Sequence, residues 1–442
     1  MSDSETKLQH EMKRELGWFD TTIIGLASVI GVGIFVSLGI AAGLSGLAVI
    51  FALILAGLLS ACNSLNLAQL AANHPVSGGI YEYGYKYLNH WLGFTGGWIY
   101  LLGKTAVAAT AALGFAGYFL NALGLFDKGL IVPVAEVAVV ILTLVVLGGM
   151  KRSKIATTIT VFITIFSLFF LIVTGLFVHA STGFEYLTFI PENSGNLLQH
   201  LLESTALMFV AYNGAARIAM VAEEIKEPRK NIPKAILLTI FITLVLYVGV
   251  AIVSLGSIGA DALSDTTAQT ASLERVALSF GIPGASKILA IGATTAMLSV
   301  LLSIILGLSR LLLAMGRRGD MPNFMAKLNS SETTPYWAVY FICAVIMLLV
   351  LTGNVKTTWS FGAFGGLYRC VIVSLAALKL SDEERLYPKW LSWIALLSCL
   401  FLAFWIEWQI WLISFGLIGM GLIWHFAIHK IKLSETINKP IP

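Results

Sequence analysis

The chain contains few charged residues for its length: Asp, Glu, Lys and Arg together make up 12% of its 442 residues. A water-soluble domain carries about 25% charged residues. With hydrophobic residues at 57% and a mean hydropathy of +0.86, this composition cannot cover a water-exposed surface. These values exclude a soluble globular protein. They predict an integral membrane protein, for which the lipid bilayer is the main solvent.

Cysteine and clustered polar chemistry are scarce as well. The four cysteines lie singly in apolar stretches: Cys62, Cys343, Cys370 and Cys399. This pattern excludes a disulfide framework and a zinc site. His425 and His429 lie at the end of the last apolar run, where we expect both to face lipid headgroups rather than a metal. No group of carboxylates, histidines and a nucleophile marks an enzyme, so we predict no catalytic site, metal, cofactor or nucleic-acid partner.

Apolar runs long enough to cross a bilayer follow one another along the chain. A helix needs about 20 apolar residues to span the hydrocarbon core. The sequence predicts an all-α fold of about twelve spans, near residues 19–43, 46–71, 94–124, 129–148, 154–178, 198–221, 233–258, 284–314, 335–352, 357–378, 390–406 and 408–428. The longest outer loop, 259–283, is too short for a soluble domain, and we expect it to form a lid.

Lysine and arginine are distributed unevenly between the predicted loops. With the N-terminus in the cytoplasm, twenty of the 28 basic residues fall in cytoplasmic segments and only four in outer loops. Cytoplasmic loops of membrane proteins carry such an excess. The first seventeen residues are polar and mixed in charge, unlike a cleavable signal peptide. We therefore predict a multi-pass protein of the cell membrane (plasma or inner) with both termini in the cytoplasm.

The first span contains two glycines near its middle, Gly31 and Gly33. Glycine weakens a helix, and irregular backbone at membrane depth persists only where it lines a cavity or is buried in protein. At such a break the following N–H groups suit a carboxylate, and the preceding carbonyls suit an ammonium group. The substrate-binding candidates are Val29, Ile30, Gly31, Val32, Gly33 and Ile34. The alternative is that the glycines only allow close helix packing.

The sixth span contains a second interruption. Asn213-Gly214 is a turn-forming pair in the middle of an apolar run. The first and sixth spans run in opposite directions. Interruptions at matching places in two inverted halves indicate a transporter's binding site. The substrate-binding candidates here are Phe209, Ala211, Tyr212, Asn213 and Gly214. Two facing breaks fit a zwitterion whose carboxylate and ammonium group lie on one carbon.

Five motifs occur in order along the chain. They are Gly-Val-Gly-Ile-Phe at 31–35, Pro-Val-Ser-Gly-Gly-Ile-Tyr at 75–81, Gly-Trp at 97–98, the Glu- and Pro-rich segment 222–233, and the Arg- and Gly-rich segment 309–322. Together they resemble the amino acid–polyamine–organocation (APC) superfamily, and most closely the prokaryotic relatives of cationic amino acid transporters. The resemblance covers almost the whole chain.

The resemblance implies a LeuT-like 5+5 inverted repeat with broken helices 1 and 6. It divides the chain into a cytoplasmic N-terminal segment, two five-helix repeats, two peripheral helices and a cytoplasmic tail, at residues 1–17, 18–180, 181–380, 381–429 and 430–442. It also implies secondary active transport of small neutral or cationic amino acids by alternating access, coupled to protons or sodium or operating as exchange. A polyamine or amine carrier, and a membrane sensor that binds substrate without transporting it, are the alternatives.

Polar residues within the spans are candidates for coupling to an ion, because such residues are costly in lipid and mark transport pathways. The candidates are Lys104, Thr164, Ser299 and Ser303. For Lys104, the alternative is a structural ion pair with Glu136 or a side chain that snorkels to the membrane surface. Carboxylates are scarce within the spans, Glu136 and Glu203 being the main ones, and this scarcity favours a small neutral substrate.

The loop after the sixth span supplies candidates for an inner gate. Glu223 and Glu224 lie close in sequence to Arg229, and we expect an ion-pair network there, with a solvated loop as the alternative. Members of the superfamily often have Phe-Asp where this chain has Ala215-Ala216. An aromatic gate over the substrate is therefore either missing or supplied by Phe209 or Tyr212.

Overall fold

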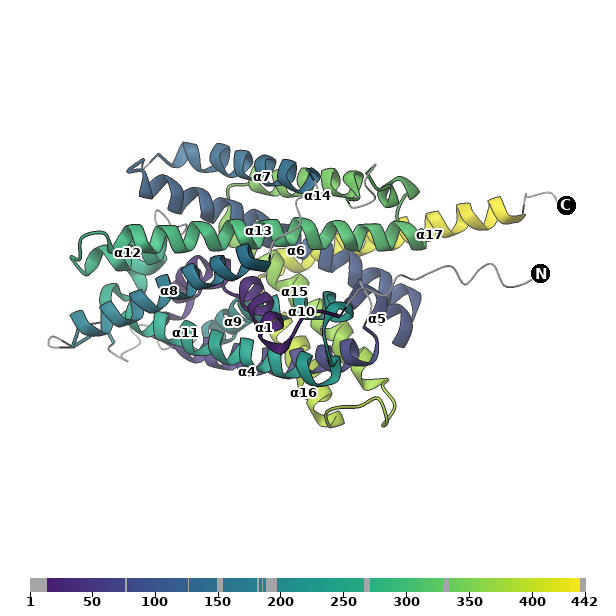
Figure 1. Ribbon diagram of the computed structural model, residues 1–442, viewed down its shortest axis with the longest axis horizontal. Coiled ribbons are helices and arrows are strands. Elements are labelled where there is room, and N and C mark those ends of the chain that lie inside the picture. The colour runs from purple at the N-terminus through teal and green to yellow at the C-terminus, as the bar shows by residue number, and fades with distance from the viewer. Residues whose placement is uncertain are drawn as a thin grey trace.

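The computed structural model in Figure 1 describes residues 14–75, 78–125, 127–148, 154–180, 183–184, 186–187, 197–265, 271–329 and 334–437. Its regular structure in these ranges is helical, apart from an isolated parallel bridge between Leu16 and Ile225. Within the described ranges, nine helical stretches are long and apolar enough to cross a membrane, and two shorter apolar helices accompany them. The predicted all-α membrane architecture agrees with these findings.

The helices follow one another with few gaps. In chain order they are α1 (Trp18–Val29), α2 (Val32–Phe35), α3 (Ser37–Ser45), α4 (Val49–Asn73), α5 (Ile80–Tyr87), α6 (His90–Ala122), α7 (Ile131–Leu147), α8 (Lys154–Val178), α9 (Leu197–Phe209), α10 (Ala216–Met220), α11 (Pro228–Ser264), α12 (Ser272–Ser279), α13 (Ala285–Arg318), α14 (Tyr336–Val350), α15 (Val355–Leu378), α16 (Lys389–Ala403) and α17 (Trp408–Ile437). Short 3₁₀ helices lie between them: η1 (Gly46–Ala48), η2 (Lys128–Leu130), η3 (Val210–Ala215), η4 (Ala222–Glu224) and η5 (Asn323–Ala326).

Each predicted span overlaps one of these helices or a group of them. The first predicted span is divided into α1, α2 and α3, and the sixth into α9, η3 and α10. The helix α17 continues nine residues beyond the predicted end at 428, to Ile437. Two short helices lie between spans: α5 follows α4, and α12 lies inside the loop predicted to be a lid.

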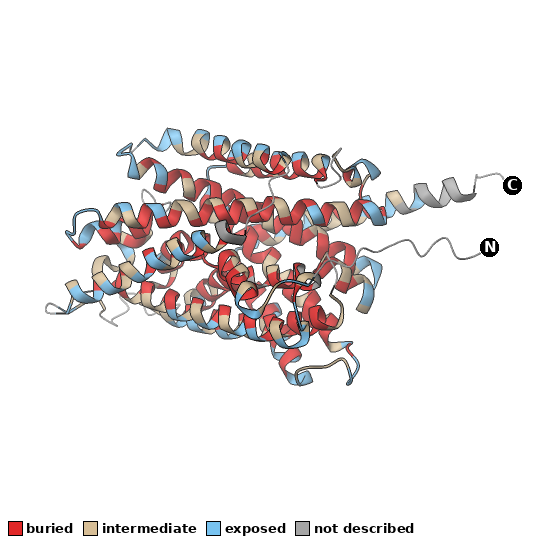
Figure 2. Ribbon diagram, in the orientation of Figure 1, coloured by how far each residue is buried: buried red, intermediate tan, exposed pale blue. Residues whose placement is uncertain are grey.

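The centre of the bundle is formed by α6, which packs against α13 and α15. The backbones of α6 and α15 cross closely at two glycines: a Cβ added to Gly103 would lie 3.0 Å from the Cα of Gly365. Small residues allow such close approach of helices in membranes, where dispersion contacts replace the hydrophobic effect. In Figure 2 the buried residues gather in the middle, while outer faces of peripheral helices such as α8 carry exposed apolar side chains, among them Phe177 at 80% exposure.

A cluster of buried polar side chains joins α5, α13 and α17 at the end of the bundle opposite α12 (Figure 1). Tyr81 and Tyr85 of α5 donate hydrogen bonds to Asp320 Oδ2 at 2.6 and 2.5 Å. His425 Nδ1 of α17 lies 3.3 Å from Asp320 Oδ1, an ion-pair distance without hydrogen-bond geometry. Asp320 and His425 are both 1% exposed. Arg318 Nη2 donates a hydrogen bond to Glu82 Oε2 at 2.5 Å. We call these residues the Asp320 cluster.

The prediction that His425 faces lipid headgroups is wrong. Its ring stacks on Phe94, with ring centroids 4.5 Å apart, and lies beside Asp320. The sequence did not show that α17 packs against α6 and α15, so a histidine near a span end was expected at the interface. The side chain of His429 lies outside the described part of the chain.

The helix α12 closes the opposite end of the bundle over α2. Ser272 Oγ donates to the carbonyl of Phe35 at 3.3 Å, and the N–H of Leu273 donates to the hydroxyl of Tyr118 at 3.2 Å. The hydroxyl of Tyr118 in turn donates to the Phe35 carbonyl at 2.8 Å. The loop predicted to be a lid thus contains an eight-residue helix, and Ser272 of this helix supplies a donor to the carbonyl at the end of α2.

Glu274, which also lies on α12, makes the free energy of unfolding dependent on pH. The side chain is 6% exposed, and burial raises its pKa to about 7, against a smaller lowering by Asn121. Because the folded pKa exceeds the unfolded one, this contribution to stability is present below about pH 4.5 and is lost as pH rises through 7.

We expect Glu274→Gln to leave the melting temperature nearly unchanged at pH 5 and to raise it at pH 8.5. The difference between the two pH values should amount to up to about 3 kcal/mol of unfolding free energy. The measurement is thermal unfolding of the detergent-purified chain across this pH range. The exposed Glu383→Gln is the control, with no expected difference. A Glu274→Gln effect of equal size at both pH values would contradict the assignment.

Candidate functional site

The first helix break lies between α1 and α2. The backbone leaves helical geometry at Ile30, whose φ and ψ are −78° and 110°, and α2 then begins at Val32. The glycines permit close contacts on both sides: a Cβ on Gly31 would lie 2.6 Å from Val300 Cγ2, and a Cβ on Gly33 would lie 2.5 Å from Ala211 Cβ. The break is therefore wedged between α13 and η3.

The second break is the 3₁₀ helix η3 between α9 and α10. It touches the first break directly, because a Cβ added to Gly214 would lie 2.2 Å from the carbonyl oxygen of Ser28 and 2.5 Å from the Val29 nitrogen. Only glycine allows backbone to approach backbone this closely. The two interruptions, nearly 200 residues apart in sequence, thus meet side by side.

Several backbone groups at the first break lack their usual helical partners. The N–H of Ile34 donates to the Gly31 carbonyl at 3.2 Å. Within the described chain, the N–H groups of Val32 and Gly33 have no hydrogen-bond acceptor. At the other side of the break, the Val29 carbonyl accepts from the hydroxyl of Tyr247 at 2.9 Å. The arrangement leaves two N–H donors and a polarised carbonyl near one another, as free helix ends do.

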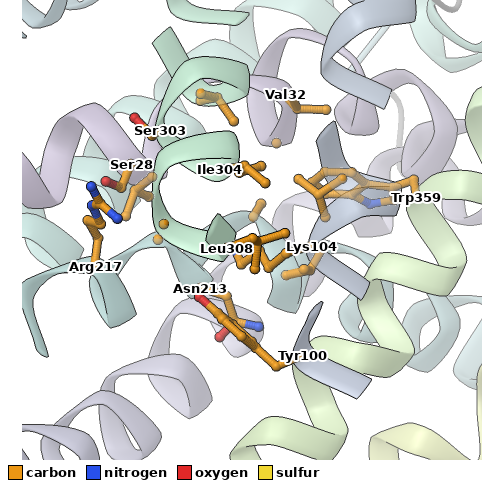
Figure 3. A pocket seen from close by; sticks show the side chains of 18 residues that line it. Ser28, Val32, Tyr100, Lys104, Asn213, Arg217, Ser303, Ile304, Leu308 and Trp359 are labelled. Carbon is orange, nitrogen blue, oxygen red and sulfur yellow. The ribbon is translucent and has the colours of Figure 1, made fainter. Parts of the chain in front are cut away.

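A cavity of about 60 Å³ opens between the two breaks (Figure 3). A water molecule needs about 10–15 Å³ on this measure, so the cavity holds several waters or a small solute. Six of the eleven predicted substrate-binding residues line it: Val29, Val32, Gly33, Ala211, Asn213 and Gly214. The other five lie outside its wall: Ile30, Gly31, Ile34, Phe209 and Tyr212.

Neither aromatic residue expected to gate the site faces the cavity. Phe209 is fully buried, and Tyr212 points to α4, where its hydroxyl donates to the Leu53 carbonyl at 3.1 Å. The aromatic lining comes instead from Tyr100 of α6 and Trp359 of α15 (Figure 3). Tyr100 precedes Lys104 by one helical turn, so the sequence could have placed both on one face. No sequence signal marks Trp359.

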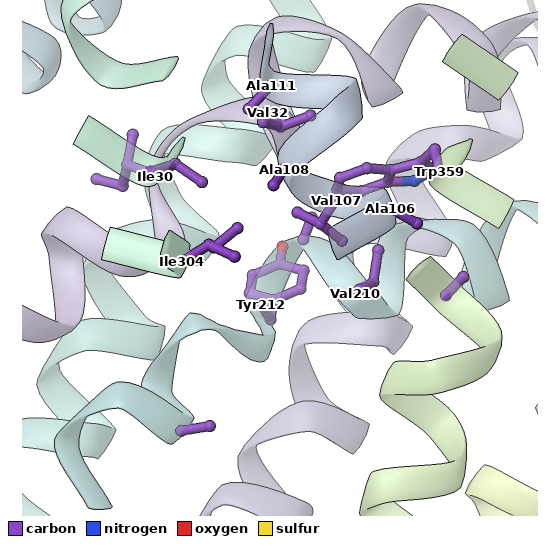
Figure 4. Close-up of a cluster of buried hydrophobic side chains, with 14 of the residues drawn as sticks. Ile30, Val32, Ala106, Val107, Ala108, Ala111, Val210, Tyr212, Ile304 and Trp359 are labelled. Carbon is purple, nitrogen blue, oxygen red and sulfur yellow. The ribbon is translucent and has the colours of Figure 1, made fainter. Parts of the chain in front are cut away.

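One wall of the cavity is apolar (Figure 4). The ring of Trp359 lies there beside branched aliphatic side chains, namely those of Val32, Val107, Val210 and Ile304. The indole N–H of Trp359 donates to the Leu207 carbonyl at 3.1 Å, which fixes the ring. This wall suits an aliphatic or aromatic part of a solute, whereas the backbone groups of the helix breaks suit its charged part.

The charged side chains around the cavity are all basic. Lys104 of α6 and Arg217 of α10 line it, and no aspartate or glutamate does so within the described part of the chain. The alternative ion pair between Lys104 and Glu136 is wrong, because neither carboxylate oxygen of Glu136 has a hydrogen-bond partner among the described residues. The other carboxylate, Glu203, does not line the cavity, and its Oε2 lies 3.7 Å from His200 Nδ1.

The four ion-coupling candidates fall into two places. Lys104 and Ser303 line the main cavity. Thr164 and Ser299 line a separate cavity of about 10 Å³ next to Ile30. The hydroxyls of Thr164 and Ser303 donate to carbonyls of their own helices, at 2.8 and 2.7 Å. Their oxygen lone pairs can still accept or ligate a cation.

The inner-gate candidates lie where the loop after α10 meets the N-terminal segment. The carbonyl of Glu224 accepts from the N–H groups of Glu15 and Leu16, both at 3.0 Å. Arg229 donates to Asn73 Oδ1 of α4 at 2.7 Å. The side chain of Glu223 lies outside the described residues. The loop is thus tied by backbone and amide hydrogen bonds to two other segments.

Comparison with known proteins gives an independent result. The family model described as amino acid permease matches residues 20–433. An uncharacterized transporter of Mycobacterium tuberculosis is 33% identical over 89% of this chain and 86% of its own length. A branched-chain amino acid permease of Bacillus subtilis is 28% identical over 97% and 96%. A vacuolar cationic amino acid transporter of Arabidopsis thaliana is 26% identical over 82% and 64%.

Proposed function

This chain belongs to the amino acid permease family of the APC superfamily, and from that membership we propose that it is a secondary active transporter of amino acids. The observation that carries the proposal is the direct contact of the two helix breaks beside one cavity. A membrane protein keeps irregular backbone at depth only where it lines such a cavity or is buried in protein. Interrupted helices at a repeat interface are the usual place for substrate in transporters.

The substrate's common part binds at the breaks. The N–H groups of Val32 and Gly33 receive the α-carboxylate, and backbone carbonyls including that of Val29 receive the ammonium group. The hydroxyl of Tyr247 orients the Val29 carbonyl by its hydrogen bond. The apolar wall around Trp359 receives the side chain.

The charge of the cavity supports substrates without a positive side chain. Lys104 and Arg217 would repel a lysine- or arginine-like side chain, and no described carboxylate lines the cavity to attract one. A buried cation without a partner is costly, so a cationic substrate would need such a carboxylate. This supports small neutral amino acids over cationic ones as substrates. The relatives include both a branched-chain amino acid permease and a cationic amino acid transporter.

The proposed transport cycle uses the topology expected from the sequence. The chain crosses the cell membrane twelve times as a 5+5 inverted repeat with two peripheral helices, both termini are cytoplasmic, and the site opens alternately to each side. A proton or sodium ion is coupled through the cavity of Thr164 and Ser299 or through Lys104. The contact of Glu224 and Arg229 with neighbouring segments supports a gate at the inner side.

A ligand screen tests this proposal. The melting temperature of the purified chain is measured with the twenty amino acids and common polyamines, at pH 5.5 and 7.5, with and without sodium. A ligand that binds only the folded state raises the midpoint by mass action. We expect small neutral amino acids to raise it and their amides and decarboxylated amines to have no effect.

Two results would contradict the proposal in different ways. A rise with amines that lack a carboxylate, and with no amino acid, would make the chain an amine carrier. Binding without counterflow of the same amino acid in liposomes would make it a sensor. The sodium and pH arms identify the coupling ion.

A further inference from the structure

A second basic group lies behind the wall of the substrate cavity. Arg369 of α15 is 3% exposed, and its Nη2 donates to Asn213 Oδ1 at 2.7 Å and to Cys370 Sγ at 3.1 Å. Its Nε and Nη1 have no hydrogen-bond partner among the described residues. No carboxylate forms an ion pair with it in that part of the chain. A buried guanidinium with open donors carries a large desolvation cost, so a missing partner is expected.

Arg369 also lines a small cavity. It measures about 10 Å³ and is lined by Arg369, Lys104, Asn213, Tyr100 and Val210, together with glycines of α6 and α15. Four of these residues also line the substrate cavity, so the two spaces share a wall: Lys104, Asn213, Tyr100 and Val210. The volume is close to that of one water-sized sphere. It therefore accommodates a single atom, such as a carboxylate oxygen or one monatomic ion.

The polar side chains that line this cavity offer hydrogen-bond donors, so they favour a hydrogen-bond acceptor as the bound group. Lys104 and Arg369 supply only donors. The side-chain oxygen of Asn213 accepts from Arg369, and its side-chain nitrogen is a donor without a partner among the described residues. Two positive charges face the same small space, with no described acid to balance them. Glycines at 362, 365 and 366 add no further side chain to the α15 side of this space, so Arg369 is the α15 side chain that lines it.

We propose that Arg369, Lys104 and Asn213 form an anion-binding subsite next to the substrate cavity. The inference rests on the proposed function, and it narrows the substrate class. The bound group is either a carboxylate at the end of the substrate's side chain or a small inorganic anion that accompanies a neutral amino acid. Either one supplies the negative charge that the protein itself does not place between these two cations.

The test compares ligands that differ only in charge. Binding to the purified full chain is measured for glutamate against glutamine, and for alanine in chloride against gluconate. Each measurement is repeated with Arg369→Gln, Lys104→Gln and Lys356→Gln. Lys356 lies on the same helix, α15, but pairs with Glu407 at 2.6 Å away from both cavities, so it controls for loss of one positive charge.

We expect binding to be tighter by about tenfold or more, equivalent to about 1.4 kcal/mol, either for glutamate than for glutamine or for alanine in chloride than in gluconate. Both cavity variants should abolish this preference, and Lys356→Gln should retain it. A preference for glutamate assigns the subsite to a substrate carboxylate, and a chloride requirement assigns it to an inorganic anion. If Arg369→Gln does not fold, Lys104→Gln carries the comparison.

Failure of this inference is separable from failure of the proposed function. Amino acid binding that is indifferent to side-chain charge and to chloride would overturn the subsite and leave the transporter proposal intact. Absence of all amino acid binding, with thermal stabilisation by chloride that Arg369→Gln removes, would overturn the transporter proposal and support the subsite. Absence of both responses would overturn both.

Discussion

Replacing Gly214 with alanine is expected to eliminate amino acid counterflow. The added Cβ would lie 2.2 Å from the Ser28 carbonyl oxygen and 2.5 Å from the Val29 nitrogen. Both atoms belong to backbone, which cannot rotate away as a side chain does. The two breaks must separate, and the backbone groups proposed to hold the carboxylate and the ammonium group move apart. We expect a loss of stability of about 1–3 kcal/mol, as for overpacked cores, together with loss of binding.

The measurements are counterflow in liposomes and the melting temperature with and without substrate. Gly416→Ala and Gly419→Ala provide matched controls on α17, because nothing lies within 4 Å of a Cβ at either position. Alanine is the better helix former, so these variants should transport normally and melt no lower than the parent chain. Normal counterflow by Gly214→Ala would show that the contact between the breaks is not needed.

Replacing Asp320 with alanine should destabilise the fold more than any exposed charge substitution. The carboxylate accepts from Tyr81 and Tyr85, and both hydroxyls would lose their acceptor together; its other oxygen lies 3.3 Å from His425 Nδ1. Removing one partner of a buried charged network costs about 3–5 kcal/mol. Burial and the nearby carboxylate raise the pKa of Tyr81 and Tyr85 well above the ordinary value, so both hydroxyls remain donors at any working pH.

Thermal unfolding and amide hydrogen exchange test this expectation. Asp320→Ala should melt lower and increase exchange in α5, whereas Asp320→Asn keeps an acceptor oxygen and should lose less. Asp382→Ala is the control, because that aspartate is 86% exposed, pairs at the surface with Lys389 and lies 3.8 Å from the Nε of the buried Arg385. Equal melting temperatures for Asp320→Ala and Asp382→Ala would show that the Asp320 cluster does not hold α5 in place.

The helical architecture was predictable because lipid leaves the backbone no alternative. A long apolar run must satisfy its hydrogen bonds internally, so span positions follow from hydropathy. The two interruptions were also predictable, since Gly31, Gly33 and the pair Asn213-Gly214 are unusual in such runs. Each of these signals is local in sequence, and the structure shows both breaks.

The orientation of side chains around the breaks was not predictable in the same way. Helical periodicity restarts after each interruption, so the sequence did not show that Val32 faces the cavity while Ile34 does not. Trp359 enters the cavity because α15 packs against α6 and α9, a contact between distant segments. The position of His425 likewise depends on where α17 crosses the bundle.

The brevity of the helices at the breaks has a consequence for biogenesis. The 13 residues of α9 extend about 20 Å, less than the roughly 30 Å of the hydrocarbon core, and the four residues of α2 extend far less. Among the described helices, the nine able to span by length and composition do not include α9 or α10. Their unpaired backbone ends are tolerated only against protein, here α1, α4 and α11, and α11 is synthesised after them. The proposed substrate site is therefore completed by folding within the bilayer after later helices have inserted, so a partly synthesised chain has its membrane anchors before it has a pocket.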